Sequence, residues 1–211
     1  MCAGKAFQST EPDEVVAQAG GVAQQGPSKL PPYTTKLLLW SFTIGIVPPI
    51  VLVGALAVKS LYALDYVHVI CGGTWTGFDI YMGLVMTRVL RSLEVPARVE
   101  VAKRLTPTTF FIIPSLAAVA ITSGIYLAQS MGKFDLSSPW IITAGVVVLI
   151  LTAQGFGVFM PNGVRIFLEL AKAKPDVDKI ARLNMRNIRL AGSQAFFQVI
   201  IILIMAHLAI Y

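Results

Sequence analysis

The sequence of 211 residues carries little charge, and this scarcity limits the classes of protein that it can encode. Only 13% of its residues are Asp, Glu, Lys or Arg, whereas soluble domains carry about 25%. Hydrophobic residues make up 55% of the chain, and the mean hydropathy is +0.72. We therefore expect lipid rather than water to surround most of the chain.

Several recognisable kinds of functional site are also missing. The two cysteines, Cys2 in a polar segment and Cys71 in an apolar run, form neither a disulfide framework nor a CxxC pair. Zinc-type spacings, a phosphate-binding glycine loop and a Ser/His/Asp or Cys/His catalytic set are absent, and whether the protein is an enzyme stays open. The net charge of +6 comes without a basic patch interleaved with aromatics, which argues against a nucleic-acid partner.

Long apolar runs are what the sequence does contain. A helix needs about 20 apolar residues to cross a bilayer, and five runs are long enough: residues 37–58, 66–87, and stretches within 105–132, 136–164 and 190–211. In lipid every backbone polar group must be paired, which helices achieve within one segment. We therefore predict an all-α fold, an integral membrane helical bundle with five transmembrane helices.

Two further features concern the first span and the segment before it. Residues 1–36 are polar and rich in Gly, Gln, Pro and Ser, and we predict a disordered cytoplasmic tail there, followed by a five-helix transmembrane domain over 37–211. Pro48 and Pro49 fall in the middle of the first span, where loss of amide donors predicts a kink or break.

The basic residues predict the orientation of the chain. The segments 88–105 and 165–189 together hold 12 of the 17 Lys and Arg residues, whereas the two opposite loops hold only Lys59 and Lys133. Basic loops stay on the cytoplasmic side. We therefore expect a multi-pass protein of the cell membrane with its N-terminus in the cytoplasm and its C-terminus outside. Each basic segment contains a proline and is predicted to form a short amphipathic helix on the membrane surface.

Three ionisable residues fall inside the predicted spans: His68, Asp79 and His207. Such residues are costly in lipid and indicate function by default. Both histidines lie within about one helical turn of the outer face, and this common depth is a precondition for a shared haem or metal ion. Interfacial histidines without a ligand are the alternative. A further alternative is a copper site formed by the two histidines together with Cys71, Met131 and Met205.

The second span carries a stripe of four residues, His68, Gly72, Trp75 and Asp79, whose spacing places them on one helix face. The small residue Gly72 beside His68 either leaves a flat surface for a macrocycle or lets another helix pack closely.

A deeper polar layer consists of Asp79, Gln154 and Gln198, which share a depth of ~20 Å below the outer edge. This layer predicts a hydrogen bond between Asp79 and one glutamine, or a proton path. Gln198 and His207 are nine residues apart and project from opposite faces of the last helix. They cannot both face the second helix.

The run of residues 67–77, Val-His-Val-Ile-Cys-Gly-Gly-Thr-Trp-Thr-Gly, resembles the signature helix of the copper-resistance D family and of HemJ-type protoporphyrinogen oxidases. The resemblance covers one helix of five and implies a membrane helical bundle. It also implies that His68 is a haem ligand and that Trp75 and Gly77 are packing positions. The Phe-Asn-Glu-x-Pro and Lys-Trp elements of the HemJ-type oxidases are absent.

These observations lead to one expected function and two alternatives. We expect a b-type haem held by His68 and His207, beside Gly72 and Trp75, in a protein that transfers electrons or anchors a larger membrane complex. The alternatives are a copper- or metal-handling transport protein and an accessory subunit without a cofactor. Membrane lipid is the partner expected in every case.

Overall fold

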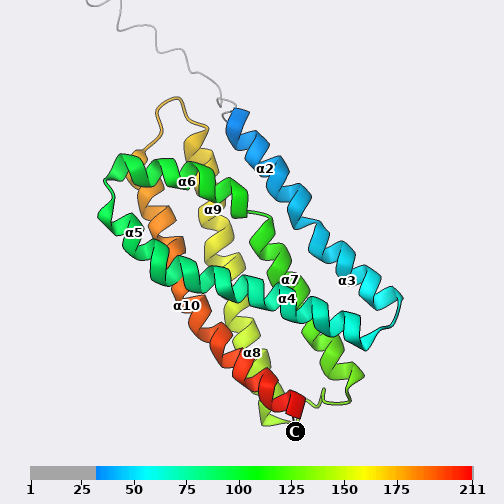
Figure 1. Ribbon diagram of the computed structural model, residues 1–211. Coiled ribbons are helices and arrows are strands. Elements are labelled where there is room, and N and C mark those ends of the chain that lie inside the picture. Colours follow the sequence, from blue (N-terminus) through cyan, green and yellow to red (C-terminus); the bar gives the residue numbers. More distant parts are fainter. Residues whose placement is uncertain (1–31, 211) are drawn as a thin grey trace, which may run out of the picture.

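The computed structural model describes residues 32–210, and every regular element in this range is helical. Five helical segments are long and apolar enough to cross a membrane: Pro32–Ala57, Leu61–Ser92, Ile112–Ser130, Pro139–Leu170 and Val177–Ile210. They pack into one bundle, and the two ends of the described chain lie at opposite ends of it (Figure 1). The protein is therefore an all-α integral membrane bundle of five spans, as predicted. Residues 1–31 of the predicted tail lie outside the described residues, whereas residues 32–36, which the sequence also predicts to belong to it, are part of the first helical segment.

The first span is divided into α2 (Pro32–Gly45) and α3 (Val47–Ala57). The division at Ile46 lies directly before Pro48 and Pro49, which occupy the first turn of α3. Their missing amide donors cost nothing at a helix start, so the prolines divide the span where the sequence predicts a break.

The second span consists of α4 (Leu61–Ile80), a π-helical segment η1 (Tyr81–Met86) and α5 (Thr87–Ser92). It begins five residues before the predicted start, because the Ser60 side chain accepts a hydrogen bond from the Ala63 amide and caps the helix. Asp65 interrupts the apolar pattern in this first turn and remains exposed. His68 consequently lies about one turn further along the helix than the sequence predicts.

The two basic segments behave differently from one another. Residues 95–109 form a separate helix, α6 (Val95–Thr109), which crosses the bundle end before α7 (Ile112–Ser130) begins. The second segment does not form a separate surface helix, and that prediction is wrong. It supplies the end of α9 (Met160–Leu170), a short loop, and the start of α10 (Val177–Ile210), which continues without a break into the fifth span. The Asp176 carboxylate accepts from the Lys179 amide and caps this long helix.

The fourth span contains a second π-helical segment, η2 (Gly155–Phe159), between α8 (Pro139–Gln154) and α9. Pro161 lies just after η2 and cannot donate to the carbonyl one turn before it. A wider helical turn over the flexible glycines of η2 accommodates the proline ring, which is a usual origin of such segments.

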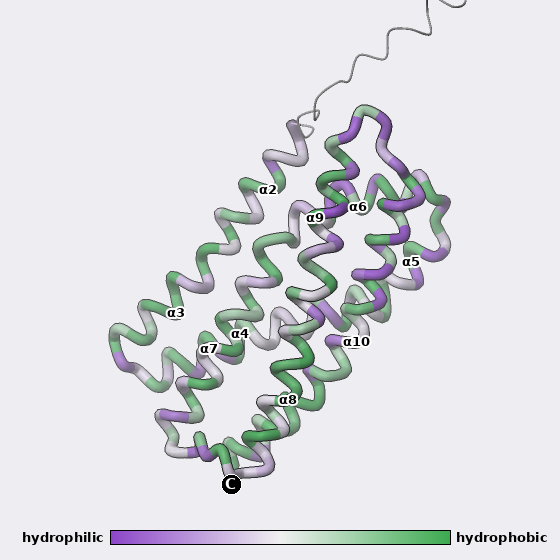
Figure 2. Tube along the Cα trace, turned by 180° about the vertical axis from the view of Figure 1, so that it is seen from behind, coloured by the Kyte–Doolittle hydropathy of each residue, from purple (hydrophilic) through white to green (hydrophobic). Residues whose placement is uncertain are grey.

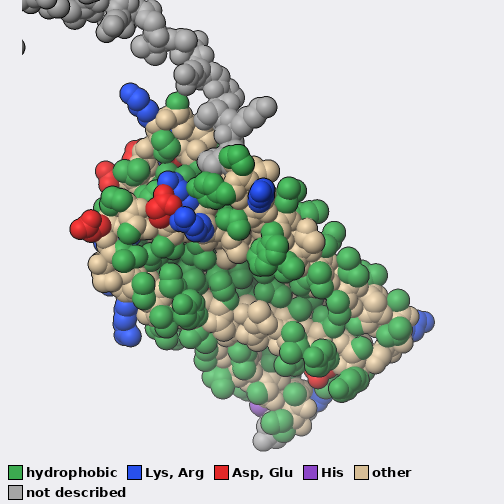
Figure 3. Space-filling view, turned by 45° about the horizontal axis from the view of Figure 1, so that its top comes forward, with side chains coloured by type: hydrophobic (Ala, Val, Ile, Leu, Met, Phe, Trp, Pro, Cys, Tyr) green, Lys and Arg blue, Asp and Glu red, His purple; other side chains and the backbone are tan. Residues whose placement is uncertain are grey.

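Polarity divides the bundle along its length. Hydrophilic residues gather around α5, α6 and the loop that follows α9, whereas the middle of the bundle is hydrophobic (Figure 2). The space-filling view shows Lys, Arg, Asp and Glu side chains concentrated at the same end (Figure 3). We call this the basic end, because it carries the two basic segments, and we call the end with the C-terminus of α10 the far end.

Small residues set the closest approach between spans. A Cβ atom added to Gly83 of η1 would lie 2.3 Å from the Cα atom of Gly192 in α10, so the two backbones touch where these helices cross. Lipid gives no hydrophobic force between helices, and such close packing is a main source of their association.

Candidate functional site

The principal candidate site is a cavity of about 180 Å³ inside the bundle. It lies toward the basic end, because it is lined by the first half of α7 and by residues 184–194 of α10, and is bounded by α6. The far half of the bundle is filled by an apolar core that includes Val67, Cys71 and Leu127. The cavity therefore reaches about to the middle of the spans and no further. Its aromatic lining consists of Trp75, Phe78, Phe110, Phe156 and Phe159.

Asp79 lies in the wall of this cavity and is only 2% exposed. Its Oδ2 atom accepts a hydrogen bond of 2.9 Å from Nε2 of Gln198, a residue that is itself 1% exposed. One turn before Asp79, the buried Trp75 also lines the cavity. Its indole N–H faces the Asp79 carboxyl but has no acceptor within hydrogen-bond geometry. A buried carboxyl group and an unpaired N–H donor thus stand side by side.

The α10 side of the cavity is polar as well. Asn184, Asn187 and Gln194 line it, and two of them are held by bonds to the fourth span. Nδ2 of Asn162 donates to Oδ1 of Asn187 at 2.8 Å, and Nε2 of Gln194 donates to the Leu151 carbonyl at 3.2 Å. These bonds fix one wall of the cavity with its polar groups in place.

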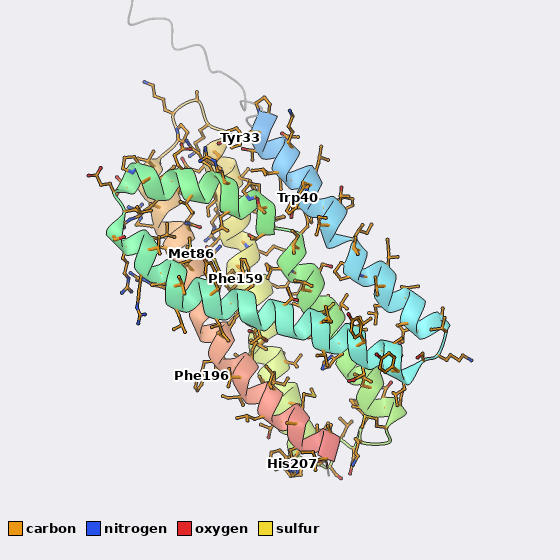
Figure 4. The ribbon with its side chains drawn as sticks, viewed as in Figure 1. Tyr33, Trp40, Met86, Phe159, Phe196 and His207 are labelled. Atoms are coloured by element: carbon orange, nitrogen blue, oxygen red, sulfur yellow. The ribbon has the colours of Figure 1, made fainter. Side chains whose placement is uncertain are left out.

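Both π-helical segments border the cavity. Met82 of η1 and Gly155, Phe156 and Phe159 of η2 are among its lining residues; Figure 4 labels Phe159 on its helix. Segments of this kind are frequent at functional sites, because the wider turn redirects side chains. Their presence on two different spans at one cavity makes this region the leading candidate for a functional site.

The cavity is not closed on every side. α7 packs closely on α2, α3 and α4, whereas its side toward α8 and η2 borders the cavity. Two lining residues at this border, Ala118 of α7 and Phe156 of η2, are exposed at the surface of the bundle. The cavity therefore opens sideways between α7 and η2, toward the lipid.

His68 lies outside the cavity, at the contact between α4 and α7. Its Nδ1 atom is 2.9 Å from the Ala120 carbonyl oxygen and 3.2 Å from Oγ of Ser123. The ring also packs on Gly124, where an added Cβ atom would lie 2.8 Å from Cε1 of the imidazole. Gly72 faces the same helix, since its added Cβ atom would lie 3.8 Å from the Cβ atom of Ala120.

His207 has a different neighbour. Its ring stacks on Trp140 of α8 with centroids 3.9 Å apart and an interplanar angle of 26°. It lies near the end of α10, as labelled in Figure 4. The structure thus holds His68 against α7 and His207 against α8. Among the described residues no group of three or more His, Cys, Asp or Glu side chains could hold a metal ion.

The predicted polar layer is divided between two partners. Gln198 bonds to Asp79, as the layer predicts for one of the two glutamines, whereas Nε2 of Gln154 donates to Oγ of Ser193 at 3.3 Å. Gln198 and His207 face different helices, in agreement with their spacing. Of the predicted stripe, Trp75 and Asp79 line the cavity and His68 and Gly72 face α7.

Sequence reasoning missed the cavity and its asparagines. The sequence predicts a surface segment around Asn184 and Asn187, because the basic residues around them hide the continuation of the fifth helix. The signal that could have revealed them is their spacing from Gln194, which places all three near one face of a continuous helix.

Comparisons with protein-family models, with curated proteins and with solved structures find no match.

Proposed function

We propose that the protein binds a small, largely apolar molecule in the cavity, with Asp79 as its polar anchor. The observation that carries the proposal is a buried carboxyl group in the wall of an open, aromatic-lined space within the membrane-spanning part. An ionisable side chain at such a depth is costly and is kept for function. Cavities with mainly apolar linings and a few placed polar groups are the usual form of small-molecule sites.

The size of the cavity limits the occupant. Its volume of about 180 Å³ is close to that of an engineered apolar cavity of about 150 Å³ that binds benzene, and is below the ~300 Å³ typical of drug-sized ligands. We infer that one ring or a short chain is enclosed, and that any longer part of the ligand extends into the lipid.

The experiment compares the small molecules that copurify with the wild-type protein and with Ala117→Phe, which fills the cavity. Ala153→Phe is the matched control, because Ala153 is exposed on the outer side of α8. Solvent extraction followed by mass spectrometry should recover a molecule from the wild type and from Ala153→Phe, and much less of it from Ala117→Phe and Asp79→Leu. Equal recovery from all four proteins contradicts the proposal.

A second candidate function is haem binding at His68, with electron transfer or membrane anchoring of a redox complex as its purpose. The contact of Nδ1 with the Ala120 carbonyl supports it, because histidines that ligate metals commonly donate their other ring N–H to such a group. Nε2 of His68 would then hold the iron, and the haem would supply reversible one-electron transfer. A haem shared with His207 requires that ring to leave its stack on Trp140.

The visible absorption spectrum of protein expressed with ample haem tests this second candidate. A haem band that disappears in His68→Ala supports it, and the same band in His207→Ala and in wild type would show that His207 takes no part. Bound copper without a haem band favours the metal-handling alternative. A spectrum without a band and a preparation without metal contradict both, and favour the accessory subunit.

A further inference from the structure

The chemistry of the cavity wall specifies the polar group of its ligand. Asp79 supplies carboxyl oxygens, and Trp75, one turn away on the same helix face, supplies an indole N–H that faces the carboxyl without forming a hydrogen bond of regular geometry. A buried donor that stays unpaired costs free energy, and that cost is removed if the ligand brings an acceptor. The polar group should therefore accept from Trp75 and also pair with the Asp79 carboxyl, as a donor when that group is ionised.

A hydroxyl group meets both conditions with a single atom, whether the carboxyl is ionised or protonated. An ammonium group donates to Asp79 but has no lone pair for the Trp75 N–H. A carbonyl or ether oxygen accepts from Trp75 but has no proton for an ionised Asp79, and an anion is repelled by an ionised carboxylate. A hydroxyl oxygen carries one donor and two acceptor lone pairs, and so satisfies both neighbours.

The walls indicate the remainder of the ligand. Phe78, Phe110 and Phe159 surround the space next to this pair, and aromatic rings pack well on other rings. The opening between α7 and η2, bordered by Ala118 and Phe156, faces lipid and not water. The cavity is covered toward the basic end by a packed cluster that includes Ala102, Ile166 and Ile180.

We propose that the ligand is a membrane-dissolved phenol or ring-bearing alcohol, whose hydroxyl group bridges Trp75 and Asp79 and which enters sideways between α7 and η2. This inference rests on the proposed binding at the cavity. It adds the chemical class of the ligand, the residue that selects it, and the route from the bilayer.

Two probes of matched shape test the hydroxyl group: 4-butylphenol and butylbenzene, each at the same mole fraction in lipid nanodiscs that hold the full-length protein. Binding is followed by the rise in melting temperature as the probe concentration increases. We expect the phenol to bind at least ~10-fold more tightly than butylbenzene. One hydrogen bond is worth about 0.5–1.5 kcal/mol, so Trp75→Phe should reduce this preference about fivefold, and Trp40→Phe, on exposed α2, should leave it unchanged.

The outcomes separate the inference from the proposed function. If both probes bind equally, and Ala117→Phe weakens both, the cavity is a binding site but the hydroxyl inference is wrong. If neither probe binds and Ala117→Phe changes nothing, the proposed function itself is wrong. Loss of phenol preference in Asp79→Leu, with butylbenzene binding retained, supports the bridge and shows that the variant still folds.

The route is tested by closing the opening. Cysteines at positions 118 and 156, in a Cys2→Ser and Cys71→Ser background, are joined by a bis-maleimide linker, and the same double variant without linker is the control. We expect the rate of phenol binding to fall at least ~10-fold when the two segments are joined. An unchanged rate would show that the ligand enters elsewhere.

Discussion

Asp79 and Gln198 are 119 positions apart in the sequence, yet a hydrogen bond of 2.9 Å between buried side chains joins them across α4 and α10. The bond ties the second span to the fifth at the depth where the cavity ends. It therefore contributes to the packing of the bundle and also fixes the position of the carboxyl group in the cavity wall.

The first prediction concerns this pair. Asp79→Asn should change the free energy of unfolding by less than about 1 kcal/mol, because an amide oxygen can still accept from Gln198. Asp79→Leu leaves the Gln198 amide unpaired and should cost about 1–3 kcal/mol. Unfolding in a lipid or detergent environment provides the measurement. A double-mutant cycle with Gln198→Leu should give a coupling of about 0.6–1.7 kcal/mol, as for other bonds between membrane helices; a coupling of zero would show that the bond does not stabilise the fold.

The second prediction concerns the helix crossing at Gly83. Its replacement by Ala would place a Cβ atom 2.3 Å from the Gly192 backbone, which cannot move aside as a flexible side chain can. We expect Gly83→Ala to destabilise the protein by about 1–3 kcal/mol. Gly73→Ala is the control, because Gly73 is exposed on α4 and an added Cβ atom meets nothing within 4 Å. It should be neutral or stabilising by about 0.5–1 kcal/mol. Equal effects of the two substitutions would mean that the backbones at Gly83 and Gly192 are not in close contact.

The third prediction concerns the loop between α9 and α10. Glu169 is 2% exposed, forms ion pairs of 2.9 Å with Lys172 and 2.7 Å with Lys179, and accepts from the Asp176 amide. Glu169→Leu removes all three interactions and should lower the melting temperature, because each is a hydrogen bond to a charged group. Glu100→Leu is the control, because the Glu100 side chain is 51% exposed where it pairs with Lys103 and Arg104. Thermal unfolding in detergent should show a clear loss for Glu169→Leu only.

The fourth prediction concerns orientation. The basic end should face the cytoplasm, since it carries the two segments rich in Lys and Arg. A reporter inserted at Asp176 should therefore be active on the cytoplasmic side, and one fused after Tyr211 on the other side. A cytoplasmic signal from the fusion after Tyr211 would reverse the orientation of the whole bundle.

The number and order of the spans could be predicted because each run of apolar residues carries its own signal. Their starts could not be predicted where a polar residue lies inside a helix, as Asp65 does in α4. Depth alone predicts a bond between Asp79 and one of two glutamines, but neither the choice of Gln198 nor the partners of the histidines, since these depend on how helices rotate against one another. His68 lies against Gly124, and His207 against Trp140, through contacts that involve four different spans.

The cavity was beyond sequence reasoning for a related reason. It lies between α7 and the fourth span where η2 interrupts that span, and helical periodicity does not reveal a wider turn. Pro161 and the glycines at 155 and 157 are visible in the sequence, but they predict an irregularity and not its direction. The space beside Asp79 therefore becomes apparent only in three dimensions.

The unequal lengths of the spans affect the membrane around the protein. α7 has 19 residues and is about 28 Å long, whereas the second span has 32 residues and is about 48 Å long. The hydrocarbon core of a bilayer is about 30 Å thick, so the long span must tilt or project, while α7 just matches that thickness. In a thicker bilayer the lipid next to α7 has to become thinner, and this cost rises with each added ångström. The lateral opening to the cavity is bordered by this same short helix, so bilayer thickness acts directly at the entrance.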